Sequence, residues 1–187
     1  MKKLKLVFGL LLLTIAIFGQ TAQDAKDYIS EKVGGSNPLP NYGNHVFFSD
    51  NILLSDAENL AGRKLSADEF KYLFIYMRDI FTDGSKRKWA FAVAESVDIR
   101  GITKVSTTRN TGDTRDDNYC TITVYLDGNR LAKQYGHSSV DNQKKYESIS
   151  KMEILISDDY NIATNIKLAI IKMGDIYGIL IKDGDKF

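Results

Sequence analysis

Apolar residues recur at helical spacing in two parts of the chain. Ser66-Ala67-Asp68-Glu69 forms a capping-box sequence before one such stripe, which predicts a helix over residues 66–81. A second stripe, with Asp158 or Asp159 as its N-cap, predicts a helix over residues 159–177. A hairpin turning at residues 174–175 fits the second segment too. We favour the helix because the stripe runs through the whole segment, although Gly174 would cost it about 1 kcal/mol relative to alanine.

Alternating apolar and polar residues predict strands in most of the remaining chain. Cys120, Ile122 and Val124 fall on one face of such a strand. Asp127-Gly128 is typical of a tight hairpin turn, so residues 130–135 are expected to return as the partner of this strand. The other predicted strands are 44–48, which 51–54 would extend, 88–97, 99–108 and 147–157. The sequence therefore predicts an α+β fold, an antiparallel sheet of about five to six strands with two packed helices.

The first residues of the chain are typical of an export signal. Three lysines precede an uncharged apolar run over residues 6–18, and small and polar residues follow. This run is shorter than the roughly 20 residues that span a membrane. We expect a cleaved signal peptide over residues 1–23, a flexible leader over 24–42, which holds both prolines, and a single domain over 43–187. The mature protein would be secreted or periplasmic and have no membrane span.

Composition and charge narrow the function classes. The chain has 187 residues, of which 43% are hydrophobic and 26% charged, as in an ordinary globular domain. Loss of the three signal lysines would lower the formal charge by three, from +1 to −2, so the chain lacks the basic character of a nucleic-acid-binding domain. Cys120 is the only cysteine, which excludes an internal disulfide. Its place in an alternating strand predicts a buried packing residue rather than a catalytic thiol.

No motif in the sequence predicts a catalytic or cofactor site. His45 and His137 are far apart and have no metal-ligand spacing around them. Phosphate-binding loops and a nucleophile elbow are missing from the sequence. Several aspartates between residues 113 and 117 could attract calcium, but Arg115 lies among them and the EF-hand register is not met. We therefore expect no metal and no cofactor.

The leading hypothesis is a non-catalytic secreted or periplasmic domain that binds a protein partner or a small ligand, as an inhibitor or immunity protein does. The alternative is a small secreted hydrolase that uses His137 with a nearby carboxylate. Recognition residues are often placed on loops held by a rigid scaffold. We therefore expect the binding residues Arg115, Asp116 and His137 on loops 109–118 and 136–145, or failing these the outward face of Tyr119 and Tyr125. The sequence leaves the oligomeric state open.

Overall fold

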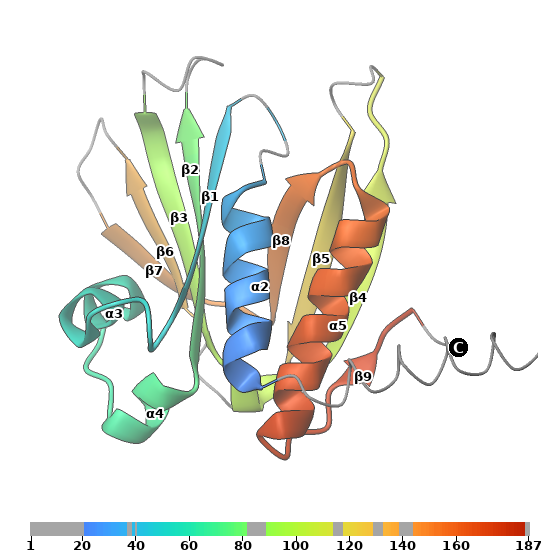
Figure 1. Cartoon of the computed structure of the whole chain (residues 1–187). Coiled ribbons are helices and arrows are strands. Elements are labelled where there is room, and N and C mark those ends of the chain that lie inside the picture. The colour runs from blue at the N-terminus through green and yellow to red at the C-terminus, as the bar shows by residue number, and fades with distance from the viewer. Residues whose placement is uncertain are drawn as a thin grey trace, which may run out of the picture.

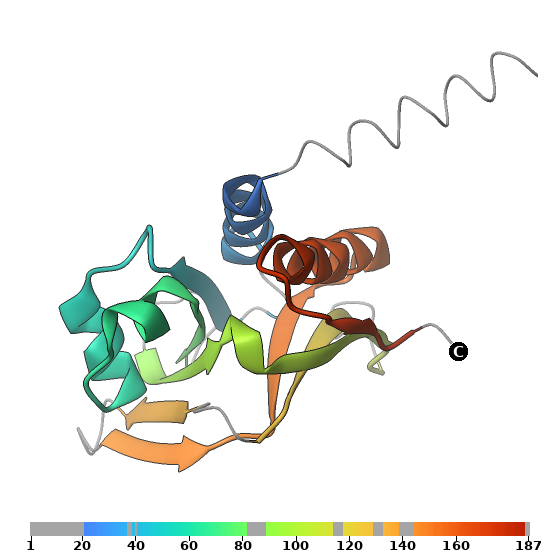
Figure 2. The ribbon, with the colours of Figure 1, turned by 90° about the horizontal axis from the view of Figure 1, so that it is seen from below.

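The computed structural model describes residues 21–36, 39, 41–81, 89–113, 118–128, 133–138 and 144–185. In these residues the chain has an α+β fold with two β-sheets, and two helices, α2 (Ala22–Gly34) and α5 (Tyr160–Ile176), lie side by side against them (Figures 1 and 2). Two short helices, α3 (Leu54–Ala61) and α4 (Ala67–Lys71), lie on the other side of the first sheet. None of the described helices has the length and apolar character needed to cross a bilayer.

Each sheet has its own strand order. The first sheet has the order β1-β2-β3-β6-β7 and is antiparallel throughout. The second has the order β8-β5-β4-β9, in which only the pair β4 and β9 is parallel. A 3-10 turn, η1 (Ile99–Gly101), joins β3 to β4 and so carries the chain from one sheet to the other. The strands are β1 (Tyr42–Phe48), β2 (Leu73–Phe81), β3 (Trp89–Asp98), β4 (Ile102–Asn110), β5 (Tyr119–Leu126), β6 (Lys133–Ser138), β7 (Lys144–Ser148), β8 (Lys151–Ser157) and β9 (Lys182–Asp183).

The single sheet expected from the sequence is therefore two sheets, and the expected hairpin after β5 does not form. Gly128 does adopt the positive φ of 55° that suits a tight turn. However, β6 pairs with β3 in the first sheet, whereas β5 lies between β4 and β8 in the second. A turn residue sets only local backbone geometry, and strand pairing is decided by which apolar faces can be buried. Here Cys120, Ile122 and Val124 are buried in the main core.

The predicted helix over residues 66–81 is wrong beyond its first turn. The capping box is present, since Ser66 accepts a hydrogen bond from the backbone N–H of Glu69 and Glu69 accepts one from that of Ser66, but α4 ends at Lys71. Strand β2 then runs between β1 and β3. Phe74 and Tyr76 are buried on one face of β2, and Leu73 and Ile75 on the other. A strand covered on both faces loses the alternation that marks a strand in sequence.

The predicted helix over residues 159–177 is confirmed as α5. Asp159 is its N-cap and accepts hydrogen bonds from the backbone N–H groups of Asn161 and Ile162, both at 3.0 Å. Gly174 lies inside the helix because the returning chain crosses there. A Cβ at this position would stand 2.5 Å from the Ile181 side chain. The conformational cost of a helical glycine is thus offset by close packing of the segment that follows α5.

Part of the expected flexible leader is helical. Residues 22–34 form α2, whose N-terminus carries a capping box between Thr21 and Asp24. Ala25, Ile29 and Val33 are fully buried and belong to the main core beneath α2 and α5. The apolar residues recur every four positions along one helix face, which is the spacing that buries a helix against a core.

The two sheets are joined by side chains along the free edge of β8. The backbone N–H of Leu155 donates to the Tyr76 hydroxyl at 3.1 Å, and the Leu155 carbonyl accepts from Asn44 Nδ2 at 2.7 Å. Tyr76 in turn donates to Asn44 Oδ1 at 3.0 Å, and Glu95 accepts from the backbone N–H of Glu153 at 3.3 Å. Burial raises the pKa of both Tyr76 and Glu95. Side chains of the first sheet thus satisfy an edge strand of the second.

Candidate functional site

Of the three binding residues expected from the sequence, His137 lies within the described part of the chain. Arg115 and Asp116 lie outside the described residues. His137 lies in β6 rather than in a loop, opposite Ala92, which is opposite Asp79 on β2. Neighbouring strands are about 4.8 Å apart, so the backbone positions of His137 and Asp79 are roughly 10 Å apart. The Asp79 carboxylate is already within 3.0 Å of His45 Nε2.

An ion pair between Arg109 and Asp158, near the expected loops, stabilises the fold. Arg109, which ends up in β4, donates from Nε and Nη2 to the two carboxylate oxygens of Asp158, both at 2.7 Å. These hydrogen bonds raise the pKa of the Arg109 side chain. The bidentate pair joins β4 to the start of α5. Cys120 is fully buried, as predicted, and burial raises the pKa of its thiol.

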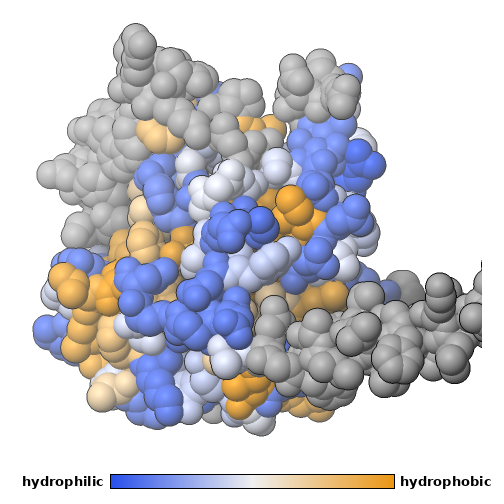
Figure 3. Space-filling view, viewed as in Figure 1, coloured by the Kyte–Doolittle hydropathy of each residue, from blue (hydrophilic) through white to orange (hydrophobic). Residues whose placement is uncertain are grey.

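The described residues expose a group of apolar side chains around α3 instead. We call this group the α3 surface, and Figure 3 shows apolar side chains gathered over α3 at the lower left of the view. Leu53 is 70% exposed and Leu54 is 41% exposed. Contiguous exposed apolar patches of this kind often mark binding sites. The α3 surface consists of Phe47, Ile52, Leu53, Leu54, Leu60 and Met77.

A shallow groove of about 290 Å³ lies within this surface. Phe47 and Met77 reach it from neighbouring strands, because β1 and β2 pair in a register that opposes His45 to Met77 and Phe47 to Ile75. Ile52 and Leu60 reach it from the segment before α3 and from α3 itself. Asp56 and Asn59 supply its only polar lining groups among the described residues. The groove therefore offers an apolar floor with one acidic group at its rim.

The two ends of α3 differ sharply in how they are stabilised. At the N-terminus, Leu53 occupies the N-cap position and makes no side-chain capping bond. Serine, threonine, asparagine or aspartate normally holds this position, and their absence costs about 1 kcal/mol. At the C-terminus, Gly62 adopts a left-handed conformation with φ of 69° and closes the helix. The Tyr146 ring covers Gly62, and its hydroxyl donates to the Asn59 carbonyl at 2.9 Å.

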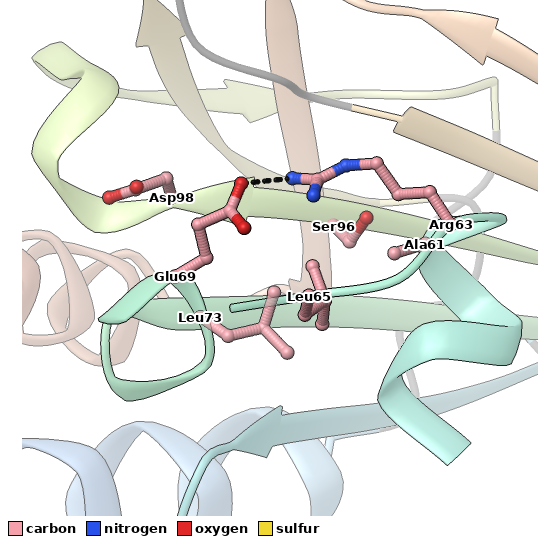
Figure 4. A pocket seen from close by; sticks show the side chains of 7 residues that line it. All are labelled: Ala61, Arg63, Leu65, Glu69, Leu73, Ser96 and Asp98. Atoms are coloured by element: carbon pink, nitrogen blue, oxygen red, sulfur yellow. Dashed lines mark ion pairs between the residues drawn. The ribbon is translucent and has the colours of Figure 1, made fainter. Parts of the chain in front are cut away.

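An ion pair fixes the loop between α3 and α4 (Figure 4). Arg63 Nη2 lies 2.8 Å from Glu69 Oε1, and the small cavity beside them measures only about 10 Å³. A cavity of this size holds about one water molecule. The side-chain hydrogen bond from Arg63, with the backbone N–H of Ser66, lowers the pKa of Glu69 to about 2. The pair thus positions α3 on the sheet rather than offering room for a ligand.

A second apolar groove, of about 450 Å³, lies between α2 and α5. Tyr28 lines it from α2, and Leu168, Ala169 and Ile171 line it from α5. Leu168 is 47% exposed there. The volume is within the range of small-molecule sites, which is about 300–1,000 Å³. Its polar lining groups are Asn165, Lys172 and Asp175.

Metal-ligating side chains do not gather in the described part of the chain, where no three His, Cys, Asp or Glu residues are placed to hold an ion. Comparison with known proteins finds no family model, no curated protein and no solved structure that matches the chain.

Sequence reasoning missed α3 because residues 51–54 were expected to extend a strand. Leu54 instead begins a helix in which Ala57 and Ala61 are buried against the sheet. The spacing of Ala57 and Ala61, followed by Gly62, was the signal that could have predicted it.

Proposed function

We propose that the chain is an exported, non-catalytic binding module, and that its α3 surface binds a protein partner. The observation that carries this proposal is Leu53, which is 70% exposed at a helix N-cap without any capping bond. The residue reduces the stability of α3 and exposes apolar area to water. Such local costs are expected where a residue is retained for binding.

The magnitude of the available binding energy supports a protein partner. Full burial of a leucine side chain contributes about 1.5–3 kcal/mol. Because Leu53 is 70% exposed and Leu54 only 41%, their burial together could contribute about 2–3 kcal/mol. The groove beside them would accept apolar atoms from a partner. Asp56 at the groove rim would favour a basic residue next to the apolar contact of that partner.

The test uses Leu53→Asp together with Leu180→Asp as its matched control. Leu180 is 80% exposed but lies between α5 and β9, outside the α3 surface. Partners captured by the mature protein from its native compartment are identified, and the affinity of each is measured by calorimetry. We expect Leu53→Asp to weaken binding at least about 10-fold and Leu180→Asp to leave it unchanged.

Leu53→Asp also separates binding from stability. Aspartate is a good N-cap, so this variant should unfold at higher urea and gain about 0.5–1 kcal/mol. A variant that is more stable yet binds less tightly cannot have lost binding by unfolding. Equal affinity of the wild-type protein and Leu53→Asp for every captured partner would refute the proposal.

A second candidate function is the binding of a small apolar molecule, which the volume and lining of the groove between α2 and α5 favour. Anilinonaphthalene sulfonate, which fluoresces in apolar sites, is the probe. Its fluorescence should fall in Leu168→Glu and persist in Leu53→Asp. The reverse result would assign apolar binding to the α3 surface alone. No observation favours the alternative of a hydrolase, which depends on the His137 side chain outside the described residues.

A further inference from the structure

The α3 surface carries a projection and a groove next to each other. Leu53 and Leu54 project at the N-terminal end of α3 and are among the most exposed apolar side chains of the described residues. The groove lined by Phe47, Leu60 and Met77 lies beside the same helix. Self-complementarity of this surface requires a two-fold axis that places the projection of each copy over the groove of the other.

The charges along α3 are also arranged so that two copies of the helix can pair. Asp56 lies in the first turn, and Lys64 follows the last turn next to Arg63, whose guanidinium is held by Glu69. Lys64 is 92% exposed, and its ion pair with Glu58 at 2.6 Å lies on the surface, where such pairs contribute little. A two-fold axis across α3 sets the two helices antiparallel, which brings Asp56 of one copy towards the exposed Lys64 of the other. The helix dipoles then also oppose each other favourably.

We infer that the partner of the α3 surface is a second copy of this chain. The leucines of each copy fill the groove of the other across a two-fold axis. This inference rests on the proposed function, since it names the occupant of the same surface. Helix α3 has eight residues and is about 12 Å long, so the interface is small. Small interfaces give weak and concentration-dependent association.

The first experiment measures self-association by sedimentation equilibrium from low micromolar to near-millimolar concentration. We expect a monomer–dimer equilibrium for the mature wild-type protein and for Leu180→Asp. Leu53→Asp should raise the dimer dissociation constant at least about 10-fold. Circular dichroism and urea unfolding of each variant show that the chain remains folded.

The second experiment tests the antiparallel arrangement with Asp56→Lys and Lys64→Glu. Each variant alone should dimerise less tightly than the wild-type protein, since like charges then meet at both ends of the interface. In an equal mixture, the lysine introduced by the first substitution would meet the glutamate introduced by the second. At the other end of the interface, the unchanged Lys64 of one chain would meet the unchanged Asp56 of the other. We therefore expect the mixture to form heterodimers more tightly than either variant forms homodimers.

The outcomes separate this inference from the proposed function. A wild-type protein that stays monomeric at every concentration overturns the inference, whereas Leu53-dependent capture of a different protein would still support the proposed function. A dimer that Leu53→Asp does not weaken uses another surface and also overturns the inference. Failure of the variant mixture to associate more tightly than its components refutes the antiparallel two-fold arrangement on which the inference depends.

Discussion

Lys167 is a buried cation on α5 that holds the C-terminal segment in place. Its ammonium group lies 2.8 Å from Asp183 Oδ1 and 2.7 Å from Asp185 Oδ2. Asp185 also accepts hydrogen bonds from the backbone N–H and the hydroxyl of Thr107 on β4. Strand β9 itself pairs with β4 through only two residue pairs. The ion pairs are therefore a main attachment of this segment to the fold.

The charges of this cluster stabilise one another. Burial acts to lower the pKa of Lys167, but the hydrogen bonds to Asp183 and Asp185 outweigh burial and raise it above its usual value. Burial likewise acts to raise the pKa of Asp185, and the hydrogen bonds from Lys167 and Thr107 outweigh it, so the pKa of Asp185 is lowered. Both groups thus remain charged in the folded protein over the neutral pH range.

Lys167→Met removes the charge and keeps much of the buried stem. The Lys167 side chain is 5% exposed, so two carboxylates would lose their cation in a largely buried place. Removing one partner of a fully buried pair costs about 3–5 kcal/mol. Asp185 keeps 26% of its side chain in water and can regain part of its hydration. We therefore expect a loss of about 2–4 kcal/mol in the free energy of unfolding.

Urea unfolding at neutral pH measures this loss, and Lys182→Met is the control. Lys182 lies in β9 next to Asp183 but is exposed, so its replacement should change stability by less than about 0.5 kcal/mol. Asp185→Asn keeps the pair between Lys167 and Asp183 and should lose about 1–2 kcal/mol. A loss below about 0.5 kcal/mol for Lys167→Met would refute the role assigned to the cluster.

The same cluster predicts two pH dependences. Because the pKa of Asp185 is lower in the folded state, its contribution is complete above the unfolded pKa and is lost as the pH falls through the folded pKa. The acid loss of stability should therefore be shallower in Asp185→Asn. Because the pKa of Lys167 is raised, its contribution is complete below the unfolded pKa and is lost as the pH rises through the folded value. Lys167→Met should lack this alkaline loss.

Three further predictions concern other parts of the chain. Gly62→Ala should lower the free energy of unfolding by about 1–2 kcal/mol, since alanine is strained at φ of 69° and its Cβ would meet the Tyr146 ring; urea unfolding checks this. Cys120→Ala should cost about 1 kcal/mol and leave binding unchanged, and fast labelling of the native thiol would contradict its burial. Mass spectrometry of protein from the native cell should show an N-terminus created by a cut between Gly19 and Gln23, and an intact Met1 would contradict cleavage.

Two of the elements that the sequence predicted correctly, α5 and β5, carry a local pattern that marks a buried face. Helix α5 has an apolar stripe and a capping aspartate, and β5 has an alternating pattern, so local spacing was sufficient for both. The helix predicted over the residues of β2 was wrong because both faces of this strand are buried. Phe70, Phe74 and Met77 then matched a helical stripe by coincidence. Such a strand can be recognised only when α3 and α4 are seen to pack against its second face.

The arrangement of two sheets could not be predicted from local patterns. It depends on Tyr76, Asn44 and Glu95, whose partners Leu155 and Glu153 are more than fifty residues away along the chain. In sequence, Asn44 next to His45 and Glu95 next to Ser96 are short polar interruptions in otherwise apolar strands. Their role becomes visible only when the free edge of β8 lies against them, because the unpaired backbone groups of that edge then need partners.

The α3 surface is different, because it contains residues that reduce the local stability of its helix. A sequence optimised for α3 alone would place aspartate or serine at position 53 and would not expose Leu53 and Leu54 to water. The rest of α3 has the features of a stable helix. Two alanines are buried, a left-handed glycine ends the helix, and an ion pair fixes the loop beyond it. A well-positioned helix with two exposed leucines at one end is therefore the kind of element that the proposed binding of a partner requires. If Leu53→Asp raises the free energy of unfolding and weakens association, then selection for binding rather than for folding explains the leucine at position 53.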